Sequence, residues 1–181
     1  MGNKKVLVIK TSPRLSGNSD ILANSFIKGI EKTNHQVKEI ALRDYQIGFC
    51  QGCLACQKGT NCVIKDDAND IVQEIKNTDV LVFATPIYFY EMNGQMKTLL
   101  DRTNLLFVQD YQFRDVYLLA ACADTALDSI DGVKNSLKGW IRCFDKSNLK
   151  AIVKGLGINQ YGEIKNHQKI LDQAFLIAKN I

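Results

Sequence analysis

The chain has 181 residues, a hydrophobic fraction of 46% and a formal net charge of +4. This length predicts one domain over residues 1–181, and no apolar run reaches the roughly 18 residues of a membrane span, so no membrane partner is expected. Lys and Arg are scattered, which gives no footprint for nucleic acid, and no signal-peptide core follows the N-terminus, so we expect a cytoplasmic protein.

Strand-like and helix-like segments alternate along the whole chain. Continuous apolar runs predict strands covered on both faces, and apolar positions at helical spacing predict the helices between them. The alternation predicts an α/β fold with a doubly wound, five-stranded parallel sheet in a three-layer α/β/α sandwich. In chain order we expect strand 4–11, helix 18–33, strand 36–42, helix 66–77, strand 79–85, helix 94–104, strand 116–122, helix 130–144, strand 149–155 and helix 166–178.

Three boundaries of these elements have a local cause. Asn18 or Ser19 is expected to cap the first helix, because short polar side chains accept the free N–H groups of a first turn. The acids Asp66 and Asp67 favour the start of the second helix through its dipole. Pro86 is expected to end the third strand. Ligands of open α/β sheets bind at the carboxyl ends of strands, so the loops that follow strands are the candidate sites.

The loop after the first strand, residues 12–19, is rich in small hydroxyl side chains. Such a loop lets backbone N–H groups converge on an anion at a helix N-terminus, and an Arg can add a charged fork. It lacks the Lys of a P-loop and the glycines of a dinucleotide fingerprint, so it suits a single phosphate monoester. An ordinary strand-to-helix turn is the alternative. The candidate ligands are Ser12, Arg14, Ser16, Gly17, Asn18 and Ser19.

Four of the six cysteines lie within 13 residues. Four thiolates at this compact spacing can hold a [4Fe–4S] cluster or a tetrahedral zinc ion. A redox-sensing or simply buried set of thiols without metal is the open alternative. Cys122 and Cys143 stand alone and are expected to be core thiols. The four clustered cysteines are Cys50, Cys53, Cys56 and Cys62.

These segments together resemble the flavodoxin-like NADPH-dependent FMN reductases, a family that includes the iron–sulfur flavoproteins. The order and spacing of the motifs carry the resemblance over residues 4–105, and the remainder matches only in its strand–helix rhythm. The resemblance implies a flavodoxin-like fold with bound FMN and with NAD(P)H as a co-substrate. The matching positions are residues 12–19, 50–67 and 85–88, together with Lys97, Asp101 and Arg102.

Aromatic side chains follow the third strand, at residues 85–90. The flavin ring is flat and largely apolar with polar edges, and a loop of backbone N–H groups beside aromatic side chains suits it. The resemblance implies flavin contacts here, with Tyr88 beside the ring, whereas packing beneath the loop or a subunit contact is the alternative. The loop after the fourth strand is a third, weaker match. The candidate flavin ligands in these two loops are Thr85, Pro86, Ile87, Tyr88, Phe89 and Asp124.

The resemblance implies an FMN-dependent NAD(P)H oxidoreductase that passes electrons to a quinone, a flavin, a nitroaromatic or an iron–sulfur acceptor. The flavin carries the chemistry, so no catalytic side chain is expected. The family also implies a homodimer or homotetramer, in which the helix with Lys97 and Arg102 contributes to the interface. Two alternatives stay open. One is an electron carrier of the flavodoxin or iron–sulfur flavoprotein type, for which a positive charge is unusual, and the other is a thiol-based redox sensor.

Overall fold

The computed structural model describes residues 2–59 and 61–181, so Met1 and Thr60 lie outside the described residues. Five parallel strands form the central sheet in the order β2-β1-β3-β5-β6, and a short strand, β4, pairs antiparallel with the end of β3. This is the strand order of flavodoxin-like sheets, which confirms the expected fold. The strands are β1 (Lys5–Lys10), β2 (Gln36–Ala41), β3 (Val80–Tyr88), β4 (Glu91–Met92), β5 (Asp115–Ala121) and β6 (Asn148–Gly155).

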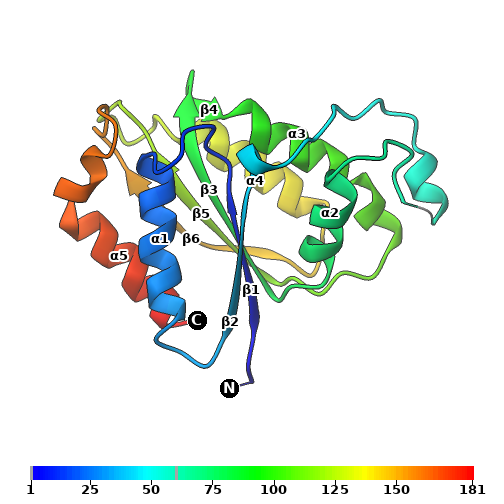
Figure 1. Ribbon diagram of the computed structural model, residues 1–181, viewed down its shortest axis with the longest axis horizontal. Helices are drawn as coiled ribbons and strands as arrows, with labels where there is room; N and C mark the ends of the chain where they lie inside the picture. Colours follow the sequence, from blue (N-terminus) through cyan, green and yellow to red (C-terminus); the bar gives the residue numbers. More distant parts are fainter. Residues whose placement is uncertain (1, 60) are drawn as a thin grey trace.

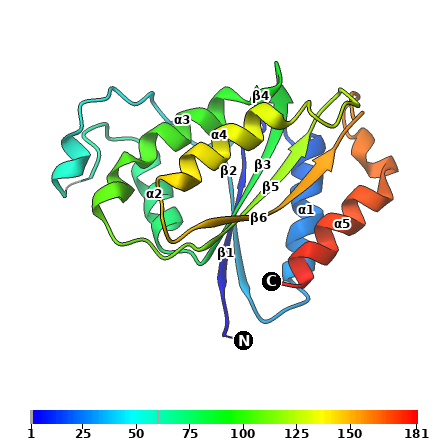
Figure 2. The same cartoon turned by 180° about the vertical axis from the view of Figure 1, so that it is seen from behind.

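Helices cover both faces of the sheet, as Figures 1 and 2 show from opposite sides. α1 and α5 lie together on one face, and α2, α3 and α4 cover the other. No helix in the described part of the chain is long and apolar enough to cross a membrane. The α-helices are α1 (Asn18–Ile30), α2 (Ala68–Lys76), α3 (Gly94–Arg102), α4 (Asp131–Arg142) and α5 (Gln168–Lys179), and the short 3-10 helices are η1 (Leu42–Asp44), η2 (Ala55–Lys58), η3 (Thr103–Val108) and η4 (Glu163–Asn166).

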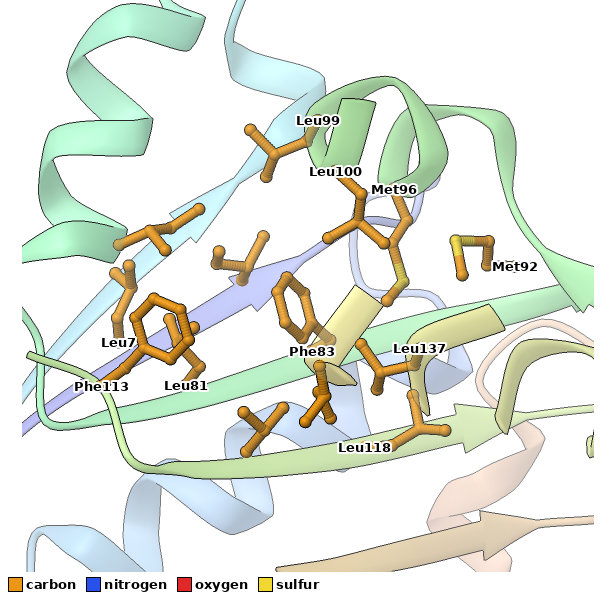
Figure 3. Packing of buried hydrophobic residues seen from close by; sticks show 14 of the residues in the cluster. Leu7, Leu81, Phe83, Met92, Met96, Leu99, Leu100, Phe113, Leu118 and Leu137 are labelled. Atoms are coloured by element: carbon orange, nitrogen blue, oxygen red, sulfur yellow. The ribbon is translucent and has the colours of Figure 1, made fainter. Parts of the chain in front are cut away.

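The hydrophobic core has two parts, one beneath each helical layer. Ile9 and Phe83 belong to the cluster under α3 and α4, and Figure 3 shows Phe83 and Met96 in this cluster. Val8 packs with Phe26 beneath α1 and α5. Neighbouring residues of a strand point to opposite faces, so a continuous apolar run fills both parts of the core. This is why the apolar runs located the strands correctly.

The third strand does not end at Pro86, as the sequence predicted, but continues to Tyr88. Pro86 lies opposite Ala121 of β5. Two residues earlier, the Ala84 carbonyl accepts the Thr11 N–H at 2.9 Å on the β1 side of the strand. Residues 84 and 86 direct their backbone groups to the same side of the strand. The nitrogen of Pro86, which carries no hydrogen, therefore faces the β1 side, where β1 has already ended at Lys10. A proline there removes no hydrogen bond from the sheet.

The start of α1 also differs from the prediction. α1 begins at Asn18, but its N-cap residue is Gly17, and no side chain among the described residues makes a capping hydrogen bond there, so the expectation that Asn18 or Ser19 caps the helix was wrong. The Asn18 carboxamide is bonded elsewhere, as described below. α2 begins directly after the two expected acids, and Asp66 accepts the N–H of Ala68 at 3.1 Å.

Candidate functional site

A cleft of about 260 Å³ opens at the carboxyl ends of β1, β3 and β5. The strand order reverses between β1 and β3, which is where flavodoxin-like sheets place their ligands. The lining comes from the loop after β1, the end of β3, the residues after β5 and part of the segment after β6. Eight of the twelve residues expected to bind the cofactor line it: Ser12, Arg14, Gly17, Asn18, Ser19, Pro86, Ile87 and Tyr88.

The other four expected residues lie near the cleft without lining it. Ser16 belongs to the 12–19 loop and has a left-handed backbone, with a φ of 56°. Thr85 is fully buried, and its hydroxyl lies 3.0 Å from the carbonyl oxygen of Pro86. Phe89 is fully exposed at the turn between β3 and β4, and Asp124 lies in the loop after β5. Their contact with a cofactor stays a prediction.

The 12–19 loop holds an unpartnered hydroxyl at the start of α1. The Ser12 hydroxyl accepts the Arg14 N–H at 3.0 Å, and the Gly17 N–H donates to the Arg14 carbonyl at 3.3 Å, so the loop forms a closed turn. Ser19 is 1% exposed, lines the cleft, and its Oγ has no hydrogen-bond partner among the described residues. A buried hydroxyl without a partner costs about 1–3 kcal/mol, so this atom is suited to a bound acceptor.

A buried ion pair lies behind this loop. Asp20 Oδ2 accepts the Ser16 N–H at 3.2 Å and pairs with Arg43 at 2.8 Å. Arg43 also lies 3.5 Å from the Ser12 carbonyl oxygen. Burial raises the pKa of the Asp20 carboxyl above its ordinary value, although the positive charges of Arg43 and Lys10 oppose the rise. Arg43 thus compensates a carboxylate beside a loop that is shaped for an anion. Sequence reasoning missed this pair because its members lie 23 residues apart.

The turn after β3 reaches across to the loop after β5. Phe89 and Tyr90 both have left-handed backbones, with φ of 50° and 63°, and form the turn into β4. The Tyr90 hydroxyl donates to Asp124 at 3.0 Å. Hydrogen bonds from the Ala126 N–H and from Tyr90 hold the pKa of Asp124 below its ordinary value, and the same bond raises the pKa of Tyr90. This contact joins two of the loops around the cleft.

A fourth wall of the cleft was not predicted. Ile158, Asn159 and Tyr161, from the segment between β6 and α5, line the cleft together with the expected residues. The strand-end rule points to this segment as well, because β6 is parallel to its neighbours and ends at the same edge of the sheet. No residue type in the segment marks it as a binding loop, which is why the motifs did not locate it.

The four clustered cysteines lie in the irregular segment between β2 and α2, away from the lining of the cleft. Cys53 is exposed and the other three are half-buried. Burial raises the pKa of Cys56, and charge on Cys62 adds to the rise, so these thiols are neighbours. Yet no group of three or more His, Cys, Asp or Glu side chains among the described residues is placed to hold a metal. Binding of an iron–sulfur cluster or zinc by these cysteines stays a prediction.

The two isolated cysteines differ in their surroundings. Cys122 is buried, as expected, at the end of β5. Cys143 is exposed, so the expectation of a core thiol was wrong there. It lies directly after α4, where its Sγ is 3.5 Å from the Gly139 carbonyl oxygen. A cysteine on the outer side of the last turn of a helix has no core to fill.

Arg102 anchors the cysteine segment rather than lining the cleft. Its side chain is 1% exposed and pairs with both carboxylate oxygens of Asp66, at 2.6 and 2.8 Å. The Gly48 carbonyl also accepts from Arg102 at 2.8 Å. Burial favours a higher pKa for Asp66, but the hydrogen bonds from Arg102 and from the Gly48 N–H hold it below its ordinary value. Lys97 instead pairs with Asp101 on the exposed face of α3.

The family model of the NADPH-dependent FMN reductases matches residues 4–153. The chain belongs to this family, as its motifs indicated. Solved structures share the fold of this chain. An NAD(P)H:quinone oxidoreductase from Methanothermobacter marburgensis aligns with a TM-score of 0.80 over 99% of this chain and 96% of that protein, at 15% identity. A likeness at that identity speaks for the fold alone.

Curated relatives divide into two groups. An iron–sulfur flavoprotein of Archaeoglobus fulgidus is 34% identical over 111 residues, which cover 61% of this chain and 54% of that protein. A Bacillus subtilis protein named for the NAD(P)H-dependent FMN-containing oxidoreductases, YwqN, is 28% identical over 183 residues and covers 97% of both chains. The match therefore spans about half the length of the iron–sulfur flavoproteins and nearly all of the second relative.

Proposed function

We propose that this protein is an FMN-dependent oxidoreductase that takes electrons from NAD(P)H and passes them to a small-molecule acceptor. The observation that carries the proposal is the buried, unpartnered hydroxyl of Ser19, which lines a cleft at the N-terminus of α1. Family membership supports FMN as the ligand. The names of two similar proteins, an NAD(P)H:quinone oxidoreductase and an NAD(P)H-dependent FMN-containing oxidoreductase, support the donor and suggest a quinone among the acceptors.

The 12–19 loop is suited to the phosphate end of FMN. Backbone N–H groups at the start of α1 and the helix dipole favour a dianion there. Ser19 offers its free hydroxyl, and Arg14 adds a positive charge at the exposed side of the loop. The Asp20 carboxylate would repel a phosphate, but Arg43 compensates its charge at 2.8 Å. The residues of the loop thus bind the anion and fix its position.

The other end of the cleft is suited to the flavin ring. Pro86, Ile87 and Tyr88 offer apolar and aromatic surface, and Ala121 and Ala123 are small enough to leave room beside it. Bound FMN supplies hydride and single-electron chemistry, which no side chain of this protein needs to provide. The part of the protein is to orient the ring and to exclude water from one of its faces. Thr85, Phe89 and Asp124 lie near the cleft and are proposed as further contacts of the flavin.

We further propose that the protein acts in the cytoplasm as a homodimer or homotetramer. An apolar groove of about 310 Å³ lies beside α3, between Gly94 and the half-exposed Tyr45. Phe49 lines this groove and is 82% exposed, which is costly for a side chain of its size in a monomer. Light scattering of the purified protein tests the proposal, since a monomeric mass at micromolar concentration would contradict it.

Anaerobic reduction tests the proposed function. Flavin-free protein is loaded with FMN and then mixed with NADPH or with NADH in the absence of oxygen. The flavin absorption at about 450 nm is expected to fall with one of the two nucleotides, and a quinone is expected to restore it. Binding of FMN without reduction by either nucleotide would contradict the reductase and favour an electron carrier.

The proposed reduction of FMN by NAD(P)H needs no metal from the cysteine segment, where the described residues form no group of three metal ligands. Iron and sulfide analysis of protein purified without oxygen checks this assignment. The redox-sensor alternative is tested separately by changing Cys53 and Cys56 to Ser. If NADPH still reduces the flavin of this variant but the variant no longer responds to oxidant, the result would favour sensing. An unchanged response to oxidant would exclude these two thiols as the sensor.

A further inference from the structure

The segment between β6 and α5, residues 156–164, spans the open side of the cleft between two loops. At its first end it is bonded to the loop after β5. The Gly157 N–H donates to the Asp124 carbonyl and the Ile158 N–H to the Cys122 carbonyl, both at 2.9 Å. Gly157 has a left-handed backbone, with a φ of 69°, which turns the chain away from the sheet at this point. The first end of the segment is thus fixed by main-chain contacts.

The second end of the segment is bonded to the 12–19 loop. The Tyr161 hydroxyl donates to the Leu15 carbonyl at 2.6 Å. The Asn18 carboxamide donates to the Gln160 carbonyl at 2.8 Å and accepts the Ile164 N–H at 3.2 Å. These three bonds join parts of the chain that are more than 140 residues apart in sequence. They also explain why Asn18, at the first position of α1, does not cap its helix.

The middle of the segment has a fixed shape of its own. Glu163 Oε2 accepts the N–H groups of Asn159 and Gln160, at 2.8 and 2.6 Å. Gly162 supplies the left-handed residue that this turn needs, with a φ of 73°. Tyr161, between Gln160 and Gly162 in the sequence, is 63% exposed and lines the cleft. The shape of the wall is therefore set by contacts within the segment itself.

We propose that residues 156–164 form a further wall of the phosphate end of the FMN site, and that Tyr161 and Asn18 hold this wall against the 12–19 loop and so retain the phosphate. This inference rests on the proposed function. It assigns a binding role to a segment beyond residues 4–153, where the family match ends. Tyr161 is a positioning residue, because it acts through the Leu15 carbonyl.

The chemistry of the wall fits a phosphate monoester next to a polyol. Asn159 presents a carboxamide, and Tyr161 presents an aromatic face with its hydroxyl turned to the loop. The carboxylate of the wall, Glu163, accepts the backbone N–H groups of Asn159 and Gln160 through Oε2, so this oxygen is bonded within the segment itself. Hydrogen bonds to an anion strengthen when bulk water is kept from them, so a closed wall favours retention of the phosphate.

Release of FMN tests the proposal. Holoprotein is diluted into buffer, and the recovery of free flavin fluorescence gives the dissociation rate. Tyr161→Phe removes only the hydroxyl that bonds Leu15, and Asn18→Ala removes both bonds of the carboxamide. Each is expected to raise the release rate about threefold to tenfold, which corresponds to the loss of one or two hydrogen bonds. Tyr111→Phe, which removes a phenol hydroxyl bonded to Asp145 away from the cleft, is the matched control and is expected to leave release unchanged.

Riboflavin separates a role in phosphate retention from a general loss of structure. Riboflavin lacks the phosphate, so its affinity is expected to stay within about twofold of the wild-type value in both variants. Equal weakening of FMN and riboflavin, or a release rate in Tyr161→Phe equal to that of the wild type, would overturn the inference. A wild-type protein that binds neither flavin would overturn the proposed function itself, and the inference with it.

Discussion

At the scale of single residues, the most telling side chain is Ser19. Its hydroxyl is buried at the start of α1 without a partner, so the flavin-free protein bears the cost of an unsatisfied polar group. A phosphate oxygen that accepts a hydrogen bond from this hydroxyl removes the cost of the unsatisfied group. Ser19 therefore distinguishes an anion site from an ordinary turn, because a turn would have used the hydroxyl for its own backbone.

Ser19→Ala is expected to weaken FMN binding about tenfold, because it removes a hydrogen bond to a charged group. The flavin-free variant is expected to melt at or slightly above the wild-type temperature, since the unpartnered hydroxyl is gone. Fluorescence titration with FMN and thermal unfolding measure the two effects. Ser136→Ala, which alters an exposed serine on α4 bonded to Glu91, is the control. Wild-type affinity in Ser19→Ala would place the phosphate elsewhere.

Glu163 links the wall of the cleft to pH. Hydrogen bonds from the backbone of Gln160 and Asn159 hold the pKa of Glu163 below its ordinary value. A group with a depressed folded pKa adds stability above its unfolded pKa and loses it as the pH falls through the folded value. The contribution of Glu163 is therefore complete at neutral pH, begins to fall below the ordinary Glu pKa of about 4.3 and is gone below the lower pKa of the folded state.

Glu163→Gln is accordingly expected to lower the melting temperature of the flavin-free protein at pH 7. The gap to the wild type is expected to narrow as the pH falls below the ordinary Glu pKa of about 4.3, and to close once the pH is below the lowered pKa of the folded state, where both side chains are neutral. Thermal unfolding from pH 7 to pH 3 measures it. Glu31→Gln, which removes an exposed carboxylate after α1, controls for the loss of one charge. A gap that stays constant over this range would refute the assignment.

At the scale of elements, α1 is fixed by its packing on α5. A Cβ added to Gly29 would collide with the carbonyl oxygen of Phe175 and would lie 2.7 Å from the Cβ of Ala178. The two helices therefore approach as closely as they do because residue 29 has no side chain. This contact holds the helix whose first turn forms the anion site.

Gly29→Ala is expected to lower the free energy of unfolding by about 1–3 kcal/mol, because overpacking outweighs the better helix propensity of Ala. Gly139→Ala on α4 is the matched control, since a Cβ there meets nothing within 4 Å. The control is expected to gain about 0.5–1 kcal/mol from propensity. Urea unfolding of the flavin-free variants measures both. Equal changes in the free energy of unfolding at Gly29 and Gly139 would mean that α1 and α5 can move apart without cost.

The elements themselves were largely predictable from the sequence, and their ends were less so. Continuous apolar runs located the central strands, such as β1 and β3, because a strand covered on both faces has this pattern, whereas alternating apolar residues located β2 at the edge of the sheet. The end of β3 was misplaced because the effect of Pro86 depends on where β1 stops, which is a non-local fact. Asn18 was misread for the same reason, since its partners lie at the far end of the chain.

At the scale of the whole molecule, the site is a ring of loops joined across the cleft. Tyr90 bonds Asp124, the segment after β6 bonds the same loop, and Tyr161 and Asn18 close the ring at the 12–19 loop. Motifs within one loop could be predicted from composition. The contacts between loops, and the ion pair of Asp20 with Arg43, could not, because they depend on how the strand ends are brought together.

In the cysteine segment, the sequence predicts a contact that the structure does not show among the described residues. The spacing from Cys50 to Cys62 suits a metal cluster, and relatives named iron–sulfur flavoproteins match 61% of this chain. The described residues nevertheless place no three of these side chains for a metal. Spacing predicts which thiols can meet, whereas the backbone held by Arg102 and Asp66 decides whether they do.

The most direct test of the flavin site is a crystal structure of the protein with FMN. The phosphate is expected on the 12–19 loop, with one oxygen within about 2.5–3.0 Å of Ser19 Oγ, and the ring against residues 86–88. Tyr161 is expected to keep its bond to the Leu15 carbonyl in the complex. FMN bound with its phosphate away from this loop, or a cleft that stays empty at saturating FMN, would contradict the site.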